Sequence, residues 1–230
     1  MAHIGICLPF YHTIHPATMR ALEQLEGTSE HSYALHMWKG DPNVDHARAM
    51  ALGDWLLDAR HTHLLTLDSD VWWSPGSIDR LVVRELPVIC GAYPFKAPQG
   101  TGLHNRVVGV RMLDDAASGL QRMRYIGSGF CLYRAGVIRR LCNLHPELRF
   151  NLPAHEAHNT HLAGRTSYAL WLPQIIPHTE EDGTVSREYQ TDDWSLCQRL
   201  HDAGYDIWLD LTIRLRHCGP GQEYYELEEK

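Results

Sequence analysis

The sequence LLTLDSD at residues 64–70 decides the fold, because an apolar run of strand length ends in two carboxylates separated by one residue. Side chains alternate along an extended segment, so Asp68 and Asp70 leave the end of the strand toward the same side. Carboxylates placed in this way can hold a hard divalent cation against a phosphate-bearing substrate. The alternative is a loop that only caps the next helix, since Asp and Ser are common at helix starts and the turn sequence SPG follows at 74–76.

Strand-like and helix-like segments alternate on both sides of this stretch. The predicted strands cover residues 3–10, 32–38, 63–67 and 87–92, and the predicted helices cover 16–25, 44–58 and 78–84. Later segments add strands at 107–113, 121–126, 205–209 and 212–217, and helices at 135–141 and 189–203. This order is typical of a mostly parallel, Rossmann-like sheet flanked by helices, with a small antiparallel addition. The sequence therefore predicts the α/β class.

The chain has 230 residues, 44% of them hydrophobic, which is enough for one large core. We expect one domain over residues 1–221 and a solvated or weakly ordered acidic tail over 222–230. Residues 142–188 are rich in His, Pro, Asn and Gly and have little periodicity. They are predicted to form a long mobile loop, of the kind that often binds ligands.

Charge and cysteine content restrict the partners and the compartment. The formal net charge is -7 with His neutral, so no global positive field attracts nucleic acid or an anionic membrane, and a polyanion must bind a local patch. The six cysteines include no C-x-x-C pair, which favours reduced, buried thiols. A signal sequence and a bilayer-length apolar run are both absent. We expect a soluble cytoplasmic protein without membrane contact; its oligomeric state is left open.

A second acidic group, Asp192 and Asp193, opens the predicted helix that contains apolar residues at 194, 197 and 200. A carboxylate at the mouth of a site can act as general base toward a hydroxyl within hydrogen-bond reach. The alternative is favourable charge at a helix N-terminus. One acid can cap the helix while the other takes part in chemistry.

Taken in order, these elements resemble a nucleotide-sugar-dependent glycosyltransferase of the GT-A type, close to glycosyltransferase family 2. The elements that carry the resemblance are the strand ending at Pro9, NVDHAR at 43–48, DSD at 68–70, GSGF at 127–130, DD at 192–193 and HCG at 217–219. The chain departs from many relatives at two places. WKGD at 38–41 lacks their acidic pattern near the nucleotide, and Asp192 stands where Glu is common, so Asp193 matches the base.

The resemblance implies a metal site. Asp70 would bind the metal directly, Asp68 would contact the sugar or ribose and the waters of the metal, and His217 would be the second protein ligand. An imidazole beside carboxylate and phosphate oxygens suits Mn²⁺ better than Mg²⁺. The alternative for His217 is an ordinary core or surface histidine.

The resemblance also implies a binding site for a UDP-sugar donor. It is formed by Pro9, Tyr11, Arg48, Ser69, Gly127 and Gly129, together with Asp68. Arg48 would contact the nucleotide or diphosphate, although an ion pair with Asp45 three residues earlier is an equal alternative. The two glycines would let the backbone approach donor or acceptor closely, or would only form a tight turn.

The expected reaction is metal-dependent transfer of glucose or another hexose from a UDP-sugar to an acceptor hydroxyl, with inversion. The alternatives are a retaining transferase acting on a glycan or protein, a nucleotidyltransferase or nuclease with two metals about 4 Å apart, and a non-catalytic, lectin-like module.

Compact enzymes of this kind resemble those of bacteriophages, which would place the chain in a host cytoplasm. Some of those enzymes glycosylate hydroxymethylated pyrimidines in DNA, so 5-hydroxymethylpyrimidine is the candidate acceptor. A local basic patch and the His-rich segment 151–165 would hold the phosphate backbone. The patch residues are Arg106, Arg111, Arg122, Arg124, Arg134, Arg139 and Arg140. The alternative is a solvated face. The HEAHN sequence at 155–159 has Asn at position 159, where the H-E-x-x-H zinc-protease motif needs its second histidine.

Overall fold

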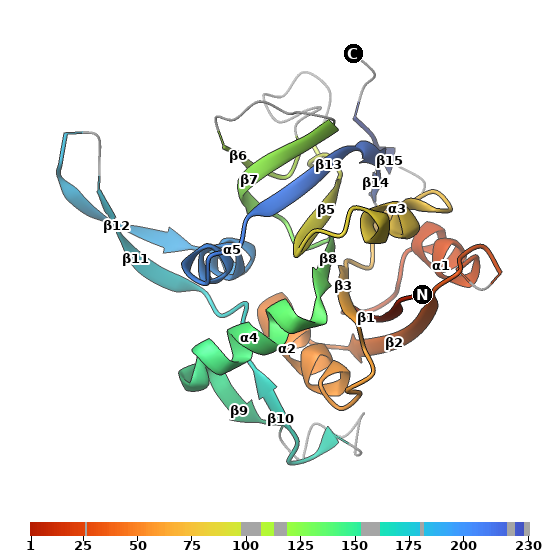
Figure 1. Cartoon of the computed structure of the whole chain (residues 1–230), viewed down its shortest axis with the longest axis horizontal. Coiled ribbons are helices and arrows are strands. Elements are labelled where there is room, and N and C mark those ends of the chain that lie inside the picture. The colour runs from red at the N-terminus through yellow and green to blue at the C-terminus, as the bar shows by residue number, and fades with distance from the viewer. Residues whose placement is uncertain are drawn as a thin grey trace.

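A computed structural model shows an α/β fold built on one large sheet (Figure 1). It describes residues 1–25, 27–97, 107–112, 119–152, 162–179, 182–219 and 224–227. In spatial order the strands of the large sheet are β2 (Ser32–Lys39), β1 (His3–Phe10), β3 (His63–Leu67), β8 (Phe130–Arg134), β5 (Val88–Ala92), β13 (Ile207–Arg214), β7 (Leu120–Ile126) and β6 (Gly109–Arg111).

Most strands of this sheet share one direction. β2, β1, β3, β5, β13 and β6 run the same way, whereas β8 and β7 run opposite to them. The predicted fold class, a mostly parallel α/β sheet with antiparallel additions, is confirmed. β8 was missing from the prediction because its short apolar run directly precedes a helix without a turn signal between them.

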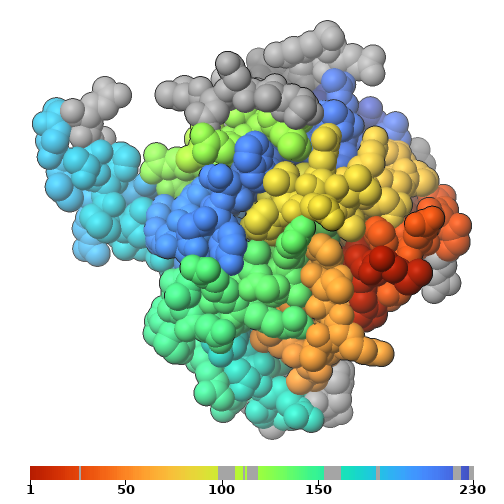
Figure 2. All heavy atoms as spheres, in the orientation of Figure 1, coloured from red at the N-terminus to blue at the C-terminus, as the bar shows by residue number. Residues whose placement is uncertain are grey.

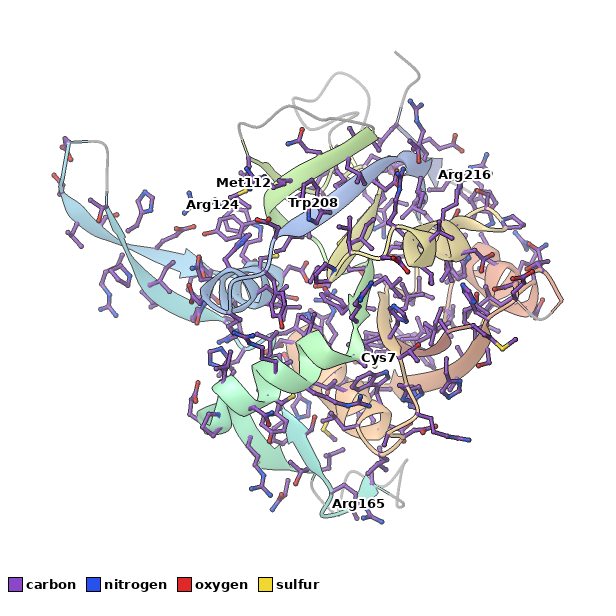
Figure 3. The ribbon with its side chains drawn as sticks, viewed as in Figure 1. Cys7, Met112, Arg124, Arg165, Trp208 and Arg216 are labelled. Atoms are coloured by element: carbon purple, nitrogen blue, oxygen red, sulfur yellow. A yellow bond between two sulfur atoms is a disulfide. The ribbon has the colours of Figure 1, made fainter. Side chains whose placement is uncertain are left out.

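Helices cover both faces of the sheet. α1 (Pro16–Glu23) and α3 (Ser77–Val83) lie on one face, and α2 (Val44–Trp55), α4 (Ala135–Leu144) and α5 (Asp192–Asp202) lie on the other. The alternation along β3 explains the two cores: Leu65 packs with the α1 and α3 side chains, while Leu64 packs with Met50 of α2. Cys7 lies in the core on the α2 side (Figure 3). Within the described ranges, no helix combines the length and apolar character needed to cross a bilayer.

Three small sheets extend the body. β4 (Val71–Trp72), β14 (Arg216–Cys218) and β15 (Tyr224–Tyr225) pair beside the end of β3, and β9 (Arg149–Asn151) pairs with β10 (Thr166–Tyr168). β11 (Gln174–Thr179) and β12 (Val185–Gln190) form a hairpin that projects from the molecule as an arm (Figures 1 and 2).

The structure corrects four predicted segments. Residues 142–188 are not one structureless loop, because they contain the end of α4, a 3-10 turn (Pro146–Leu148), both strands of the β9–β10 hairpin and most of the β11–β12 hairpin. The strands predicted at 205–209 and 212–217 are replaced by one long strand, β13 at 207–214, and the separate β14 at 216–218. α5 starts at residue 192, because 189 and 190 belong to β12. In the tail, residues 224 and 225 pair with β14.

The expectation of reduced thiols throughout is also wrong. Cys90 of β5 and Cys131 of β8 form a disulfide, whereas Cys7, Cys142, Cys197 and Cys218 are free and buried. The two paired cysteines are directly opposite on antiparallel strands, with Cα atoms 4.2 Å apart. Their separation of 41 residues in the chain hides this pairing from the sequence pattern.

Candidate functional site

The loop between β3 and β4 holds the two aspartates of the DSD sequence at the end of the sheet. The backbone N–H of Asp68 donates to the carbonyl of Gly129 at 3.0 Å, which ties the loop to the start of β8. The carbonyl of Asp70 accepts from the N–H of Cys218 at 2.7 Å. Pairing of β4 with β14 then puts His217 opposite Val71, next to Asp70.

Asp70 and His217 face each other. His217 Nε2 lies 3.6 Å from Asp70 Oδ1, and His217 Nδ1 donates to the carbonyl of Pro94 at 2.9 Å. Because a carbonyl only accepts, Nδ1 carries a proton, and Nε2 is the ring atom that faces the carboxylate. Lys96 binds the other oxygen of Asp70. Burial favours the protonated acid, but the contacts with His217 and Lys96 outweigh it and lower the pKa of Asp70 to about 2.

A cavity of about 280 Å³ opens beside these two residues. It is lined by Pro9, Phe10, Tyr11, Asp41, Pro42, Val44, Ala47, Asp68, Ser69, Asp70 and His217. The three predicted residues of the metal site therefore surround one space together with Pro9, Tyr11 and Ser69 of the predicted donor site. We call this space the DSD cavity. Asp41 was not predicted for the site. It lies there because the parallel pairing of β2 with β1 carries both strand ends to the same edge of the sheet.

Arg48 connects the acidic residues. Its side chain is 4% exposed, and its guanidinium bonds to Asp68 at 2.9 Å, Asp192 at 2.6 Å and Asp193 at 2.7 Å. Burial opposes its charge, but these three acids raise the pKa of Arg48 above its usual value. The partners of Arg48 are therefore acids up to 145 residues away in the chain, and not the predicted Asp45. Arg48 itself does not line the DSD cavity.

Asp192 and Asp193 differ in what they face. Both follow Thr191, the N-cap residue of α5, and both bind Nη1 of Arg48. Asp193 lines a second cavity of about 450 Å³, here called the Asp193 cavity, whereas Asp192 is absent from its lining. Burial and the neighbouring charge of Asp193 raise the pKa of Asp192, against the effect of Arg48.

The Asp193 cavity is largely apolar. Its walls are Phe95, Val107, Val108, Gly109, Val110, Gly127, Tyr189, Thr191, Asp193 and Trp194. The ring of Trp194 stacks on Tyr125, with centroids 4.5 Å apart and planes 9° from parallel. Tyr189, which is 62% exposed, comes from the end of the projecting hairpin. The aromatic residues were missed as site residues because aromatic positions in strands and amphipathic helices usually indicate core packing.

The two glycines of GSGF, Gly127 and Gly129, pack closely against the side chain of Tyr93. A Cβ on Gly129 would lie 2.7 Å from both Asp68 Oδ2 and the hydroxyl of Tyr93, and a Cβ on Gly127 would overlap that same hydroxyl. The N–H of Gly129 donates to the Tyr93 hydroxyl at 3.1 Å. Close packing inside the protein therefore requires glycine at both positions, and only Gly127 also lines a cavity.

The described arginines of the predicted basic patch contact different side chains. Arg122 pairs with Asp206, Arg139 lies over Trp55 and Arg140 lies over Tyr205. Figure 3 shows Arg124 near β7, well away from Arg165 beyond β10. Arg106, the side chain of Arg111 and most of the His-rich segment 151–165 lie outside the described residues.

No protein-family model matches the chain, and no curated protein matches its sequence. Among solved structures, the crystal structure of A197 from STIV superposes with a TM-score of 0.56 at 12% identity, covering 100% of this chain and 96% of that one. That likeness supports the fold alone.

Two further structures superpose at low scores. One is a glycosyltransferase involved in the glycosylation of the major capsid of PBCV-1, with a TM-score of 0.32, 13% identity, and 70% and 79% coverage of this chain and that one. The other is a glucose-1-phosphate thymidylyltransferase from Bacillus anthracis in complex with a sucrose, with a TM-score of 0.37, 13% identity, and 70% and 81% coverage. Scores at this level do not establish a shared fold.

Proposed function

We propose that this chain is a metal-dependent glycosyltransferase that moves a hexose from a UDP-sugar to an acceptor hydroxyl. The observation that carries this proposal is the bridge formed by Arg48. One guanidinium binds Asp68, which lines the DSD cavity, and Asp193, which lines the Asp193 cavity. A donor site and an acceptor site that share one reacting centre need this kind of adjacency.

The residues at the DSD cavity fit a divalent metal. Asp70 is ionised at neutral pH, and Nε2 of His217 lies 3.6 Å from its Oδ1. A carboxylate and an imidazole are suitable ligands for Mn²⁺, with Mg²⁺ the less favoured alternative. When bound, the ion would neutralise charge that develops on the leaving diphosphate. Asp68 is turned toward Arg48 and would contact the donor or waters of the ion.

The side chains near the DSD cavity supply the remaining donor contacts in this proposal. Pro9 and Tyr11 would pack against the uracil, and Ser69 would contact the diphosphate. Arg48 would act indirectly, because its guanidinium is already bonded to three carboxylates and holds Asp68 and Asp193 in place. Lys96, which binds Asp70, can move to the diphosphate when a cation replaces it.

Asp193 would be the general base. The acceptor oxygen attacks the anomeric carbon while its proton passes to the Asp193 carboxylate, and the bond from the anomeric carbon to the UDP oxygen breaks, so that UDP leaves with the bonding electrons. Attack opposite to the leaving group inverts the configuration. Asp192 would set the charge of the pair without touching the acceptor, since it does not line the Asp193 cavity.

The arrangement of charges disfavours the two-metal alternative. A nucleotidyltransferase or nuclease of that kind would need Asp192 or Asp193 as ligands of a second cation, about 4 Å from the first. Both carboxylates already bind a buried guanidinium, whose positive charge opposes a dication at the same place.

Replacing Asp70 by Asn is expected to weaken Mn²⁺-dependent binding of UDP by at least about tenfold, because it removes an anionic ligand. His217→Gln is expected to do the same. Calorimetric titration of UDP with and without Mn²⁺ measures both effects, and His145→Gln, whose ring contacts only the nearby Glu147 among the described residues, is the matched control. Affinity unchanged in Asp70→Asn and His217→Gln would remove the metal assignment.

The acceptor that we propose is a 5-hydroxymethylpyrimidine in DNA. The Asp193 cavity offers aromatic side chains that suit a planar base, with a carboxylate placed for its primary hydroxyl. A base extruded from the duplex could enter this space. The arm formed by β11 and β12, which leads into Thr191, is the surface that we assign to the strand.

Hexose is expected on hydroxymethylated bases only. The enzyme, Mn²⁺ and a panel of nucleotide sugars are incubated with duplexes that contain 5-hydroxymethylcytosine, 5-hydroxymethyluracil or unmodified bases, and the nucleosides are analysed by mass spectrometry. Donor hydrolysis without any adduct would keep the transferase proposal but replace DNA by a glycan or protein acceptor. Absence of both adduct and donor hydrolysis across the panel would contradict the transferase itself.

A further inference from the structure

A cluster of histidines lies at the end of the sheet opposite to the two cavities. His3 begins β1, His36 belongs to β2, His61 precedes β3, and Asp58 follows α2. The DSD cavity adjoins the other end of β1, roughly 20 Å away at about 3.3 Å per strand residue. The cluster is therefore separate from the proposed active site, and it does not depend on the proposed function.

Each of the three rings is oriented through Nδ1. His61 Nδ1 donates to the carbonyl of Trp55 at 3.1 Å, His36 Nδ1 lies 2.8 Å from a carboxylate oxygen of Asp54, and His3 Nδ1 lies 2.8 Å from the hydroxyl of Ser32. Carbonyl and carboxylate oxygens accept, so Nδ1 carries the proton in His61 and His36. This is how protein metal sites orient a ligating imidazole, with Nε2 left as the donor atom.

The Nε2 atoms converge. Those of His36 and His61 are 3.3 Å apart, and that of His3 lies 3.5 Å from Asp58 Oδ2. The ligand atoms of His3, Asp58 and His61 all lie within 4.8 Å of one another. A tetrahedral zinc site with bonds of about 2.0–2.2 Å keeps its ligand atoms about 3.3–3.6 Å apart, which matches both pairs.

Burial makes these atoms costly to leave without a partner. His61 is 2% exposed and His36 is 7% exposed, so their facing Nε2 atoms are shielded from water. His3 Nε2 is buried and makes no hydrogen bond within the described part of the chain, and Asp58 Oδ2 lies 3.5 Å from it. A cation placed among these atoms would give each of them a partner.

The charges around the cluster also favour a cation. Asp58 brings a carboxylate beside the rings, with Oδ2 at 3.5 Å from His3 Nε2. Arg60 is the competitor for Asp58, but its side chain is 82% exposed and can leave one oxygen free.

We propose that His3, Asp58 and His61 bind a zinc ion, and that His36, whose Nε2 lies 3.3 Å from that of His61 but outside the group of three, moves toward the ion as the fourth ligand. Three imidazoles and one carboxylate suit Zn²⁺, and a set with four protein ligands is typical of a structural site. The ion would join the start of β1 to the turn between α2 and β3. The rings of His3 and His61 are stacked, 9° from parallel with centroids 4.8 Å apart, so the more exposed His3 ring must turn to share the ion.

Tag-free protein is expected to bind one zinc ion per chain, measured by calorimetry in the presence of a competing chelator. His3→Gln and Asp58→Asn should each weaken that binding at least about tenfold. His145→Gln and Asp70→Asn are the controls and should bind zinc as the unmodified protein does. Cobalt in place of zinc should give the visible absorption of four-coordinate Co²⁺, and this absorption should be lost in His3→Gln.

Circular dichroism accompanies each variant, and His3 is exposed enough for its replacement to leave the fold intact. Three results would each overturn the proposal: no stoichiometric binding to the unmodified protein, normal affinity in folded His3→Gln, or loss of binding in Asp70→Asn. The last would move the zinc to the DSD cavity.

Discussion

Asp193→Asn is expected to lower the turnover number for sugar transfer by roughly a hundredfold or more while the affinity for the donor stays the same. Asparagine keeps the shape of the side chain but cannot take the acceptor proton. Steady-state kinetics with the acceptor proposed above, together with calorimetry of UDP and Mn²⁺, separate the two effects.

Asp192→Asn is the matched control for this prediction. This substitution also removes one carboxylate that binds the guanidinium of Arg48, at the adjacent position of α5. The Asp192 side chain, however, does not line the Asp193 cavity. A much smaller loss of turnover is therefore expected. Equal losses in the two variants would show that the acids act through Arg48, and a normal rate in Asp193→Asn would leave Asp193 as a helix cap only.

Arg48→Met is expected to lower the free energy of unfolding by about 3–5 kcal/mol at pH 7, because three partly buried carboxylates lose their common counterion. Urea denaturation measures the change. Arg60→Met is the control, since Arg60 also pairs with an aspartate but is 82% exposed, and its replacement should leave stability close to that of the unmodified protein.

The pH dependence distinguishes charge from packing in Arg48→Met. Burial and the charge of Asp193 already raise the pKa of Asp192 in the folded protein, and loss of Arg48, which opposes them, is expected to raise it further. The folded variant then binds more protons than the unfolded one, so its stability falls as pH rises through this range. The deficit relative to the unmodified protein should be largest at neutral pH and smaller near pH 4. A deficit independent of pH would mean that Arg48 acts through packing.

The local sequence was enough for most elements in the first half of the chain. Hydrophobic period, turn residues and strand length predicted β1 and β3 with the bounds that the structure has, and came within a few residues for α1, α2 and β2. The resemblance to GT-A enzymes, and no local pattern, predicted that the DSD and HCG sequences contribute to one site. The functional roles of these residues stay predictions, because geometry alone tests no reaction.

The sequence by itself determined the α/β class, the strand that ends in Asp68 and Asp70, and the acidic start of α5. Tertiary structure alone decided what pairs across the chain: Arg48 with acids up to 145 residues away, Cys90 with Cys131, and His3 with His61. The physical reason is the distance along the chain over which each effect acts. Periodicity and capping act over a few residues, whereas the order and register of strands in the sheet bring together side chains that no local pattern relates.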